Sequence, residues 1–187
     1  LENFSNEYIN WINSSNLFKL KNLSSFKYKS YVHGSSQAFD FFYSKYKNKT
    51  FRFFKGDFIY HQLSCRNNYK FKFLNDLDIK NNDAVIISLP FSDTGDIHEH
   101  TITILNKCDL LKVPVLIDCA YINLSREIEF DFKKYQCIEE VTFSLSKSFY
   151  TLDRYRIGLR LKKYFDDDPI DVFNSYDMYN KLGAFVG

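Results

Sequence analysis

Glycine and proline are scarce in this sequence, with six and three residues among 187. Hydrophobic residues make up 45% of the chain and charged residues 26%, a balance that excludes a disordered tail and a fibrous repeat. No stretch rich in glycine, serine or proline divides the chain, and no internal repeat is visible. We therefore expect residues 1–187 to form a single domain with one hydrophobic core.

Long apolar runs and a strong charge bias are also missing. The longest apolar stretches, at 84–90 and 113–117, fall far short of the roughly 20 residues that a membrane-spanning helix needs. The net charge of +2 is too small to be the electrostatic footprint of a dedicated nucleic-acid-binding protein. We expect neither a membrane nor a nucleic acid as partner.

Cysteine is present but not in a pattern that binds metal or forms a disulfide framework. The chain has Cys65, Cys108, Cys119 and Cys137, without a CxxC pair and without a signal-peptide pattern ahead of them. We expect four free thiols in a reducing cytoplasm. The first residue is Leu1 and no methionine precedes it, which favours a fragment of a longer chain.

Helical and strand patterns alternate along the sequence. Apolar spacing predicts a helical segment in residues 1–31, and a second helix that starts at Gly34 and its following serines and runs to Lys47. The rest of the pattern predicts strands at 50–54, 69–74, 84–89, 113–117, 141–145 and 157–161, a helix that ends near 111, and an acidic, then helical, tail over 162–187.

The region 84–117 indicates a βαβ unit, because two continuous apolar runs flank a helical stretch. Strands of that kind are typical of a parallel sheet that is buried on both faces. The sequence thus predicts an α/β fold with a mixed, mainly parallel sheet flanked by helices. In such sheets ligands bind at the carboxyl edge, where strands end and helices begin.

Short polar motifs lie at the predicted edge. They are Gly34-Ser35-Ser36-Gln37-Ala38, Ser92-Asp93-Thr94-Gly95, Asp118-Cys119-Ala120-Tyr121, Ser144-Leu145-Ser146-Lys147 and Arg156-Ile157-Gly158. In this order and spacing they resemble the motifs of the aspartate aminotransferase superfamily, the fold-type I enzymes that depend on pyridoxal 5'-phosphate (PLP). The resemblance covers residues 32–161, which would be the cofactor-binding core of the family's large domain.

The resemblance implies a catalytic role for three residues. Lys147 would be the Schiff-base lysine that holds the cofactor and moves protons. Asp118 would keep the pyridine nitrogen protonated, and Tyr121 would donate a hydrogen bond to the phenolic oxygen.

The resemblance also implies the rest of the cofactor site. The phosphate would be bound by Gly34, Ser35, Ser36, Ser144 and Arg156, which together offer helix N-terminal amides, hydroxyls and a guanidinium. Phe58 would stack on the pyridine ring, with Tyr60 as the second choice.

The sequence departs from the family pattern at three places. Ser92 stands where the family has an asparagine that binds the phenolic oxygen. Arg156 needs a one-residue insertion after the lysine, and Arg154 is its rival. The chain ends at Gly187, where family members continue into a small C-terminal domain that carries a substrate-binding arginine, so we expect that domain to be missing.

Two other interpretations concern metal and nucleic acid. His98 and His100 suggest a metal site, but two histidines two positions apart on a helix point to different faces, and we expect none. Aromatic and basic residues interleave at 26–31, 50–55 and 69–73. They could form a stacking platform for single strands, but strands with a buried aromatic face and a solvated basic face explain them more simply.

The activity that the resemblance implies is transfer of an amino group between an amino acid and a 2-keto acid, in a homodimer. A PLP-dependent decarboxylase-type relative is the alternative, because the same apparatus serves both reactions. The second alternative is a degenerate PLP-fold protein without full catalytic competence.

Overall fold

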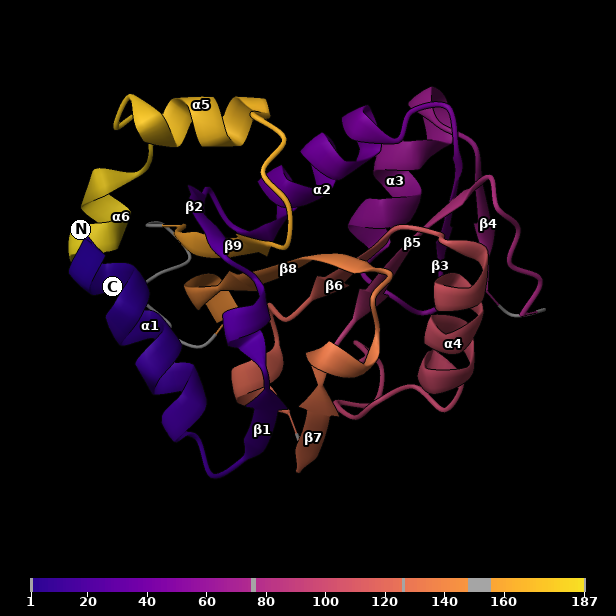
Figure 1. Cartoon of the computed structure of the whole chain (residues 1–187), viewed down its shortest axis with the longest axis horizontal. Coiled ribbons are helices and arrows are strands. Elements are labelled where there is room, and N and C mark those ends of the chain that lie inside the picture. The colour runs from indigo at the N-terminus through magenta and orange to yellow at the C-terminus, as the bar shows by residue number, and fades with distance from the viewer. Residues whose placement is uncertain (1, 75–76, 126, 148–155, 187) are drawn as a thin grey trace.

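The computed structural model describes residues 2–74, 77–125, 127–147 and 156–186 (Figure 1). Its α-helices and strands are, in chain order, α1 (Glu2–Ser14), β1 (Phe18–Lys21), β2 (Tyr28–Val32), α2 (Ser35–Lys45), β3 (Thr50–Phe53), α3 (Ile59–Asn68), β4 (Phe71–Phe73), β5 (Asp83–Ser88), α4 (Thr101–Leu111), β6 (Val115–Asp118), β7 (Ile128–Asp131), β8 (Ile138–Ser144), β9 (Gly158–Lys162), α5 (Pro169–Ser175) and α6 (Lys181–Val186).

The main sheet has the strand order β2-β9-β8-β6-β5-β3-β4. Strand β9 is antiparallel to both of its neighbours, and the other pairs in this sheet are parallel. Helices α2, α3 and α5 lie on one side of the sheet, and α1, α4 and a small two-stranded sheet lie on the other (Figure 1). The predicted α/β class, with a mixed, mainly parallel sheet flanked by helices, is confirmed.

The sequence of strand β5 is apolar at successive positions because both faces of the strand are buried. Val85 and Ile87 pack in the core cluster that contains residues of α1 and α4, whereas Ala84 and Ile86 pack in the cluster with residues of α2 and α3. Successive side chains of a strand point to opposite faces. Because helices cover both faces here, neither set is polar.

The N-terminal segment differs from the helical segment that we expected over residues 1–31. Helix α1 ends at Ser14, and the following residues form β1, a short 3-10 turn and β2. Phe18 and Leu20, which alternate with lysines, are buried on one face of β1, and β1 pairs in parallel with β7. Apolar residues at every second position, Phe18 and Leu20, form one buried face of a strand. This alternation, rather than helical spacing, determines the structure here.

The histidine pair also lies elsewhere than expected. Helix α4 begins at Thr101, so His98 and His100 precede it instead of lying on it. The ring of His98 stacks on Phe54, with ring centroids 3.7 Å apart and an interplanar angle of 14°. Its role in this structure is to pack one loop on another.

Strand β3 departs from the expected solvated basic face. Arg52 is only 2% exposed. Its guanidinium lies 2.8 Å from a carboxylate oxygen of Asp83 and donates to the carbonyl oxygen of Phe73 at 3.1 Å. The arginine therefore joins neighbouring strands inside the protein, where a buried charge requires a partner.

Two buried cations on β9 hold the C-terminal segment against the sheet. Arg160 and Lys162 are 0% and 2% exposed. Arg160 donates to both carboxylate oxygens of Asp168, at 2.6 and 2.8 Å. Lys162 donates to Asp171 at 2.5 Å and also pairs with Asp166. These charges place α5 beside β2 and β9.

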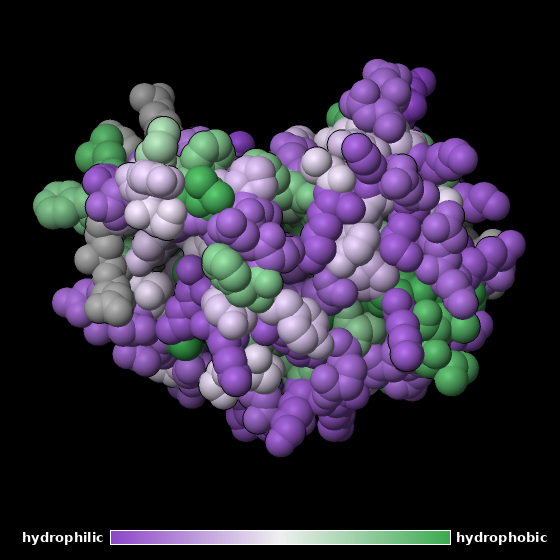
Figure 2. All heavy atoms as spheres, turned by 45° about the horizontal axis from the view of Figure 1, so that its top comes forward, coloured by the Kyte–Doolittle hydropathy of each residue, from purple (hydrophilic) through white to green (hydrophobic). Residues whose placement is uncertain are grey.

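Exposed apolar side chains are frequent in the C-terminal segment. Phe173, Tyr176, Met178, Leu182 and Phe185 are each 40–86% exposed. Elsewhere the surface is mixed: the face in Figure 2 is mostly hydrophilic, with apolar groups at its two sides. Among the described residues, none of the helices has the length and apolar character that crossing a membrane would require.

The carboxylate of Asp168 provides a test of this attachment. Burial raises its pKa, but the hydrogen bond and charge of Arg160 and the charge of Lys162 outweigh burial and lower the pKa to about 2. A lowered pKa in the folded state contributes stability above the unfolded value of about 3.9, and that stability is lost as the pH falls towards 2. We expect Asp168→Asn to lower the free energy of unfolding by about 2 kcal/mol at pH 7.

Urea unfolding at pH 7 and at pH 2.5 measures this difference. It should shrink strongly at the lower pH, where the native carboxylate is itself becoming protonated. Asp177→Asn is the control, because the Asp177 side chain is 70% exposed and its loss should change stability little. Equal effects of the two substitutions at pH 7 would contradict the assignment.

Candidate functional site

The predicted site residues converge at one edge of the sheet. Strands β2, β6 and β8 end at this edge, and the antiparallel β9 begins there. Gly158 pairs with Val32 on one side and with Ser144 on the other. This register brings Gly34, Ser144 and Arg156, which are far apart in the sequence, to neighbouring positions.

Gly34 and Arg156 are in direct contact. Gly34 has a φ of 71°, and a methyl group placed on it would lie 3.3 Å from Nε and 3.4 Å from Nη2 of Arg156. A side chain at this position would therefore be strained and would press on the guanidinium. Ser35 and Ser36 follow as the first residues of α2, the former buried and the latter half-buried. Backbone amides and a cation thus meet at the start of a helix, an arrangement that suits an anion.

Asp118 is the buried carboxylate of the site. It ends β6 and is 4% exposed, and its Oδ1 accepts a hydrogen bond from the backbone N–H of Ala120 at 3.0 Å. Burial raises the pKa of Asp118 to about 7, and the negative charge of Asp57 adds to this. Hydrogen bonds from Ala120 and Ser35 and the charge of Lys147 act in the opposite direction. A carboxylate in this setting is favoured in its charged form by an added hydrogen-bond donor or cation.

Lys147 and Tyr121 lie together. Lys147 is exposed at the end of a short 3-10 turn, Leu145–Lys147, which follows β8 directly. Its Nζ is 5.2 Å from the centroid of the Tyr121 ring. Within the described residues, the lysine amine is thus exposed beside the tyrosine ring, and its charge acts on Asp118.

Ser144 is held by its own turn. Its Oγ lies 2.8 Å from Oγ of Ser146 and accepts from the backbone N–H of Ser146 at 3.3 Å. The two hydroxyls thus join the end of β8 to the turn that carries Lys147. Arg154, the rival of Arg156, lies outside the described residues.

Phe58 and Ser92 form a second group, joined by Asp57. Phe58 precedes α3, its ring stacks on that of Tyr60 at 5.8 Å, and its N–H donates to Asp57 Oδ1 at 2.7 Å. The hydroxyl of Ser92 donates to the same oxygen at 3.4 Å. Ser88 also donates to Asp57, through both its hydroxyl and its N–H.

Asp57, Ser88 and Ser146 were not among the predicted site residues. Asp57 could have been found from the edge rule, because Gly56-Asp57 follows the strand predicted at 50–54 just as Asp118 ends another. Ser88 reads as the last residue of an apolar strand, and only the fold shows that its hydroxyl faces Asp57.

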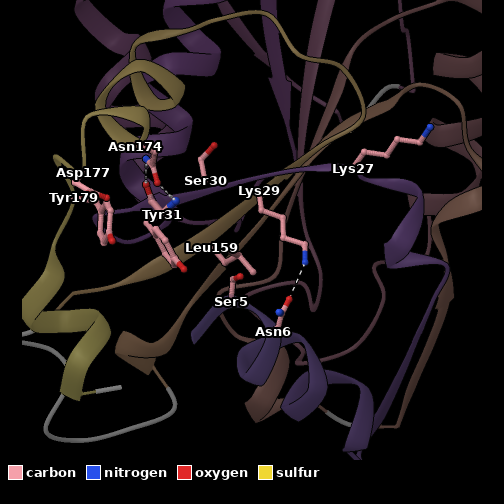
Figure 3. Close-up of a pocket in the computed structure, with 10 residues that line it drawn as sticks. All are labelled: Ser5, Asn6, Lys27, Lys29, Ser30, Tyr31, Leu159, Asn174, Asp177 and Tyr179. Atoms are coloured by element: carbon pink, nitrogen blue, oxygen red, sulfur yellow. Dashed lines mark hydrogen bonds between the residues drawn. The ribbon is translucent and has the colours of Figure 1, made fainter. Parts of the chain in front are cut away.

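A hollow elsewhere on the surface is shown in Figure 3. Residues of α1, β2, β9 and the C-terminal segment line it, and none of the predicted site residues is among them: Ser5, Asn6, Lys27, Lys29, Ser30, Tyr31, Leu159, Asn174, Asp177 and Tyr179. On one side of it the Asn174 amide bonds with both backbone groups of Tyr31.

Comparison with known proteins rests on structure. No family model and no curated protein matches the sequence. A C-S lyase from Staphylococcus hominis superposes with a TM-score of 0.71 at 14% identity, over 97% of this chain and 53% of its own. A PLP-bound putative aminotransferase from Clostridium difficile gives 0.71 at 14% identity, over 98% and 55%. L-Threonine-O-3-phosphate decarboxylase from Porphyromonas gingivalis gives 0.62 at 16%, over 83% and 53%.

The chain has the fold of the large domain of fold-type I PLP-dependent enzymes. It spans about half the length of these solved structures. At the described edge of the sheet the structure brings together two groups of predicted residues: Gly34, Asp118 and Lys147 in one, and Phe58 and Ser92, which Asp57 joins, in the other.

The pKa of Asp118 predicts how the protein without ligand depends on pH. A folded-state pKa of about 7, above the unfolded value of about 3.9, means that stability falls as the pH rises from about 4 to 7. Asp118→Asn removes this charge and keeps the shape. We expect the variant to be more stable than the native protein at pH 8, by at most about 4 kcal/mol, and nearly equal to it at pH 4.

Urea unfolding of both proteins at the two pH values, without added ligand, is the measurement. A stabilisation that is equal at pH 4 and pH 8, or a destabilisation at pH 8, would show that Asp118 is not held as a strained carboxylate.

Proposed function

We propose that the chain binds pyridoxal 5'-phosphate at the carboxyl edge of its sheet and belongs to an enzyme that transfers amino groups. The observation that carries the proposal is the meeting of Gly34, Arg156, Ser144 and Asp118 at this edge. It joins an anion site to a buried carboxylate that a cationic donor would stabilise. Both features suit a ligand with a phosphate at one end and a basic nitrogen at the other.

The phosphate would lie at the start of α2. The glycine backbone allows close approach, and the first amides of the helix point outward with a partial positive charge. Ser36 and Ser144 would donate hydroxyl hydrogen bonds, Ser35 would offer its backbone amide, and Arg156 would add a charge-assisted pair.

The ring would lie over Asp118. PLP, when bound, supplies an aldehyde that reacts with amines and a ring that withdraws electrons from the carbon being changed. The carboxylate of Asp118 would hold a proton on the ring nitrogen, and the hydroxyl of Tyr121 would donate to the phenolic oxygen. Phe58 would stack on the ring, and Ser92 would line the phenolic side.

Lys147 would carry out the proton transfers. Its amine would bind the cofactor covalently and, once displaced by a substrate amine, would take the α-proton of the substrate at Nζ. The exposed position of Lys147 beside Tyr121 supports this role in proton transfer.

Transfer of an amino group between an amino acid and a 2-keto acid is the reaction we propose. Among the similar structures are a histidinol-phosphate aminotransferase, a decarboxylase and a C-S lyase, so decarboxylase-type chemistry is the second candidate. Which bond of the substrate breaks depends on how the substrate is oriented. The residues that bind the substrate carboxylate set this orientation.

Retention of the cofactor tests the proposal. The purified protein is mixed with PLP, desalted and its visible absorption recorded. We expect a retained band that Lys147→Ala abolishes, and borohydride reduction should attach the pyridoxyl group to Lys147. Lys19→Ala, which removes an exposed lysine on β1, is the matched control and should retain the band.

The phosphate site has its own variant in the same assay. Arg156→Met should weaken PLP binding roughly tenfold or more and reduce the preference for PLP over pyridoxal, since a charge-assisted pair to phosphate is lost. A native protein that retains no cofactor would contradict the proposal and favour a degenerate PLP-fold protein.

We also propose a homodimer in the cytoplasm. The exposed apolar side chains of the C-terminal segment support an interface, and the four cysteines, buried and unpaired, suit a reducing compartment. Light scattering after size exclusion should give a mass twice the 22.3 kDa of one chain. A mass of one chain at every concentration would contradict the dimer.

A further inference from the structure

The Asp57 carboxylate joins two loops at the edge of the sheet. It lies between β3 and α3, and its Oδ1 accepts from the N–H of Phe58 at 2.7 Å, in its own loop. From the end of β5 it accepts the hydroxyl and, at 3.4 Å on Oδ2, the N–H of Ser88, and from the loop after β5 it accepts the hydroxyl of Ser92. One side chain thus fixes both loops.

Packing around this carboxylate is tight. A methyl group placed on Gly56 would lie 2.3 Å from Oδ2 of the exposed Asp93 side chain and 3.4 Å from the ring of Phe91, so the two loops are in contact. Behind them the rings of Phe54 and His98 stack, and Phe91 meets both edge-on, with centroids 6.0 and 4.7 Å away. The loops therefore have little freedom to shift independently.

Asp57 and Asp118 lie on either side of Ser88. Ser88 pairs with Asp118 across β5 and β6, and the N–H of Leu89 donates to the carbonyl oxygen of Asp118 at 2.8 Å. The hydrogen-bond partners of Asp57 in the described part of the chain are neutral donors. Its charge acts on Asp118, and among the described residues no cation forms a hydrogen bond with it.

Other titratable groups also face the two carboxylates. Asp118 is faced by Lys147 and by Tyr8 of α1 and Cys119, both fully buried and with pKa values raised chiefly by burial. Asp57 is faced by His61 and His98, whose pKa values burial lowers. The two histidines are therefore neutral near pH 7 and do not offset the charge of Asp57 there.

We propose that Asp57 is a positioning residue of this site, which holds Ser92 and the Phe58 loop in one arrangement and places a negative charge beside Asp118. What this proposal implies for PLP binding rests on the proposed function. A serine hydroxyl has a single proton, and Ser92 directs that proton to Asp57. Ser92 therefore cannot also donate it to a phenolic oxygen, and Tyr121 is left as the donor there.

Two substitutions separate the charge of Asp57 from its position. Asp57→Asn keeps the shape and removes the charge, and Asp57→Glu keeps the charge and changes the reach. Glu99→Gln is the control, because it removes a charge from the same loop region at a side chain that is 81% exposed.

The first measurement is the titration of the Asp118 carboxyl carbon by NMR in the protein without PLP, with the signal assigned through Asp118→Asn. Asp57→Asn should lower the midpoint by about half a pH unit or more, because a like charge is removed. Asp57→Glu and Glu99→Gln should leave it near the native value. An Asp57→Asn midpoint equal to that of Glu99→Gln would overturn the electrostatic role.

The second measurement is PLP affinity, followed by absorption. Asp57→Glu should bind PLP roughly tenfold more weakly than Glu99→Gln, since a longer side chain misplaces the loops that contact the ring. Asp57→Asn, which keeps the shape, should stay closer to Glu99→Gln, and native affinity in Asp57→Glu would overturn the positioning role. If the native protein binds no PLP, the proposed function fails, and the NMR titration still decides whether Asp57 controls Asp118.

Discussion

Two buried cations on β9 set the arrangement on which the rest of the structure depends. Arg160 and Lys162 lie on the face of the strand opposite Leu159 and Leu161, and a buried charge without a partner costs several kcal/mol. The carboxylates of the segment before and within α5 provide those partners. The C-terminal segment therefore folds back over β2 and β9, and β9, which runs against the other described strands of the main sheet, is held between its neighbours.

The direction of β9 matters at the site. Because it is antiparallel, its beginning rather than its end lies at the carboxyl edge, and Arg156 arrives beside Gly34. A methyl group on Gly158 would lie 2.3 Å from the carbonyl oxygen of Phe143 and 3.5 Å from Cα of Gly34. Glycines at these two positions allow the backbones to meet closely enough for one guanidinium to cover the start of α2.

The sequence predicted the parts of the fold that local pattern determines. The apolar runs of β5 and β6 and the polar residues at their ends indicated the parallel sheet and its edge, since each signal lies within a few residues. The pairing of β1 with β7 could not be predicted in this way. Each strand has only four residues, and their partners are more than a hundred positions apart.

The site was predictable to a similar extent. Gly34, Asp118 and Lys147 stand in motifs whose order carries information, and the structure brings them to one edge. Asp57 and Ser88 make a side-chain contact between a loop and the end of β5, and such contacts depend on the fold rather than on spacing. The burial of Asp118 also depends on the fold. Its buried carboxylate lowers stability when no ligand is bound, and a cationic ligand would stabilise it. Such a conflict is typical of functional positions.

The C-terminal segment also protects the sheet. Strand β2 is an edge strand, and an edge strand presents free backbone groups that another chain can join. The Asn174 amide accepts from the N–H of Tyr31 at 2.7 Å and donates to its carbonyl oxygen at 3.0 Å, as the backbone of a further strand would. The Asn174 side chain thus occupies one position of an eighth strand and makes the outward backbone groups of Tyr31 unavailable to another chain.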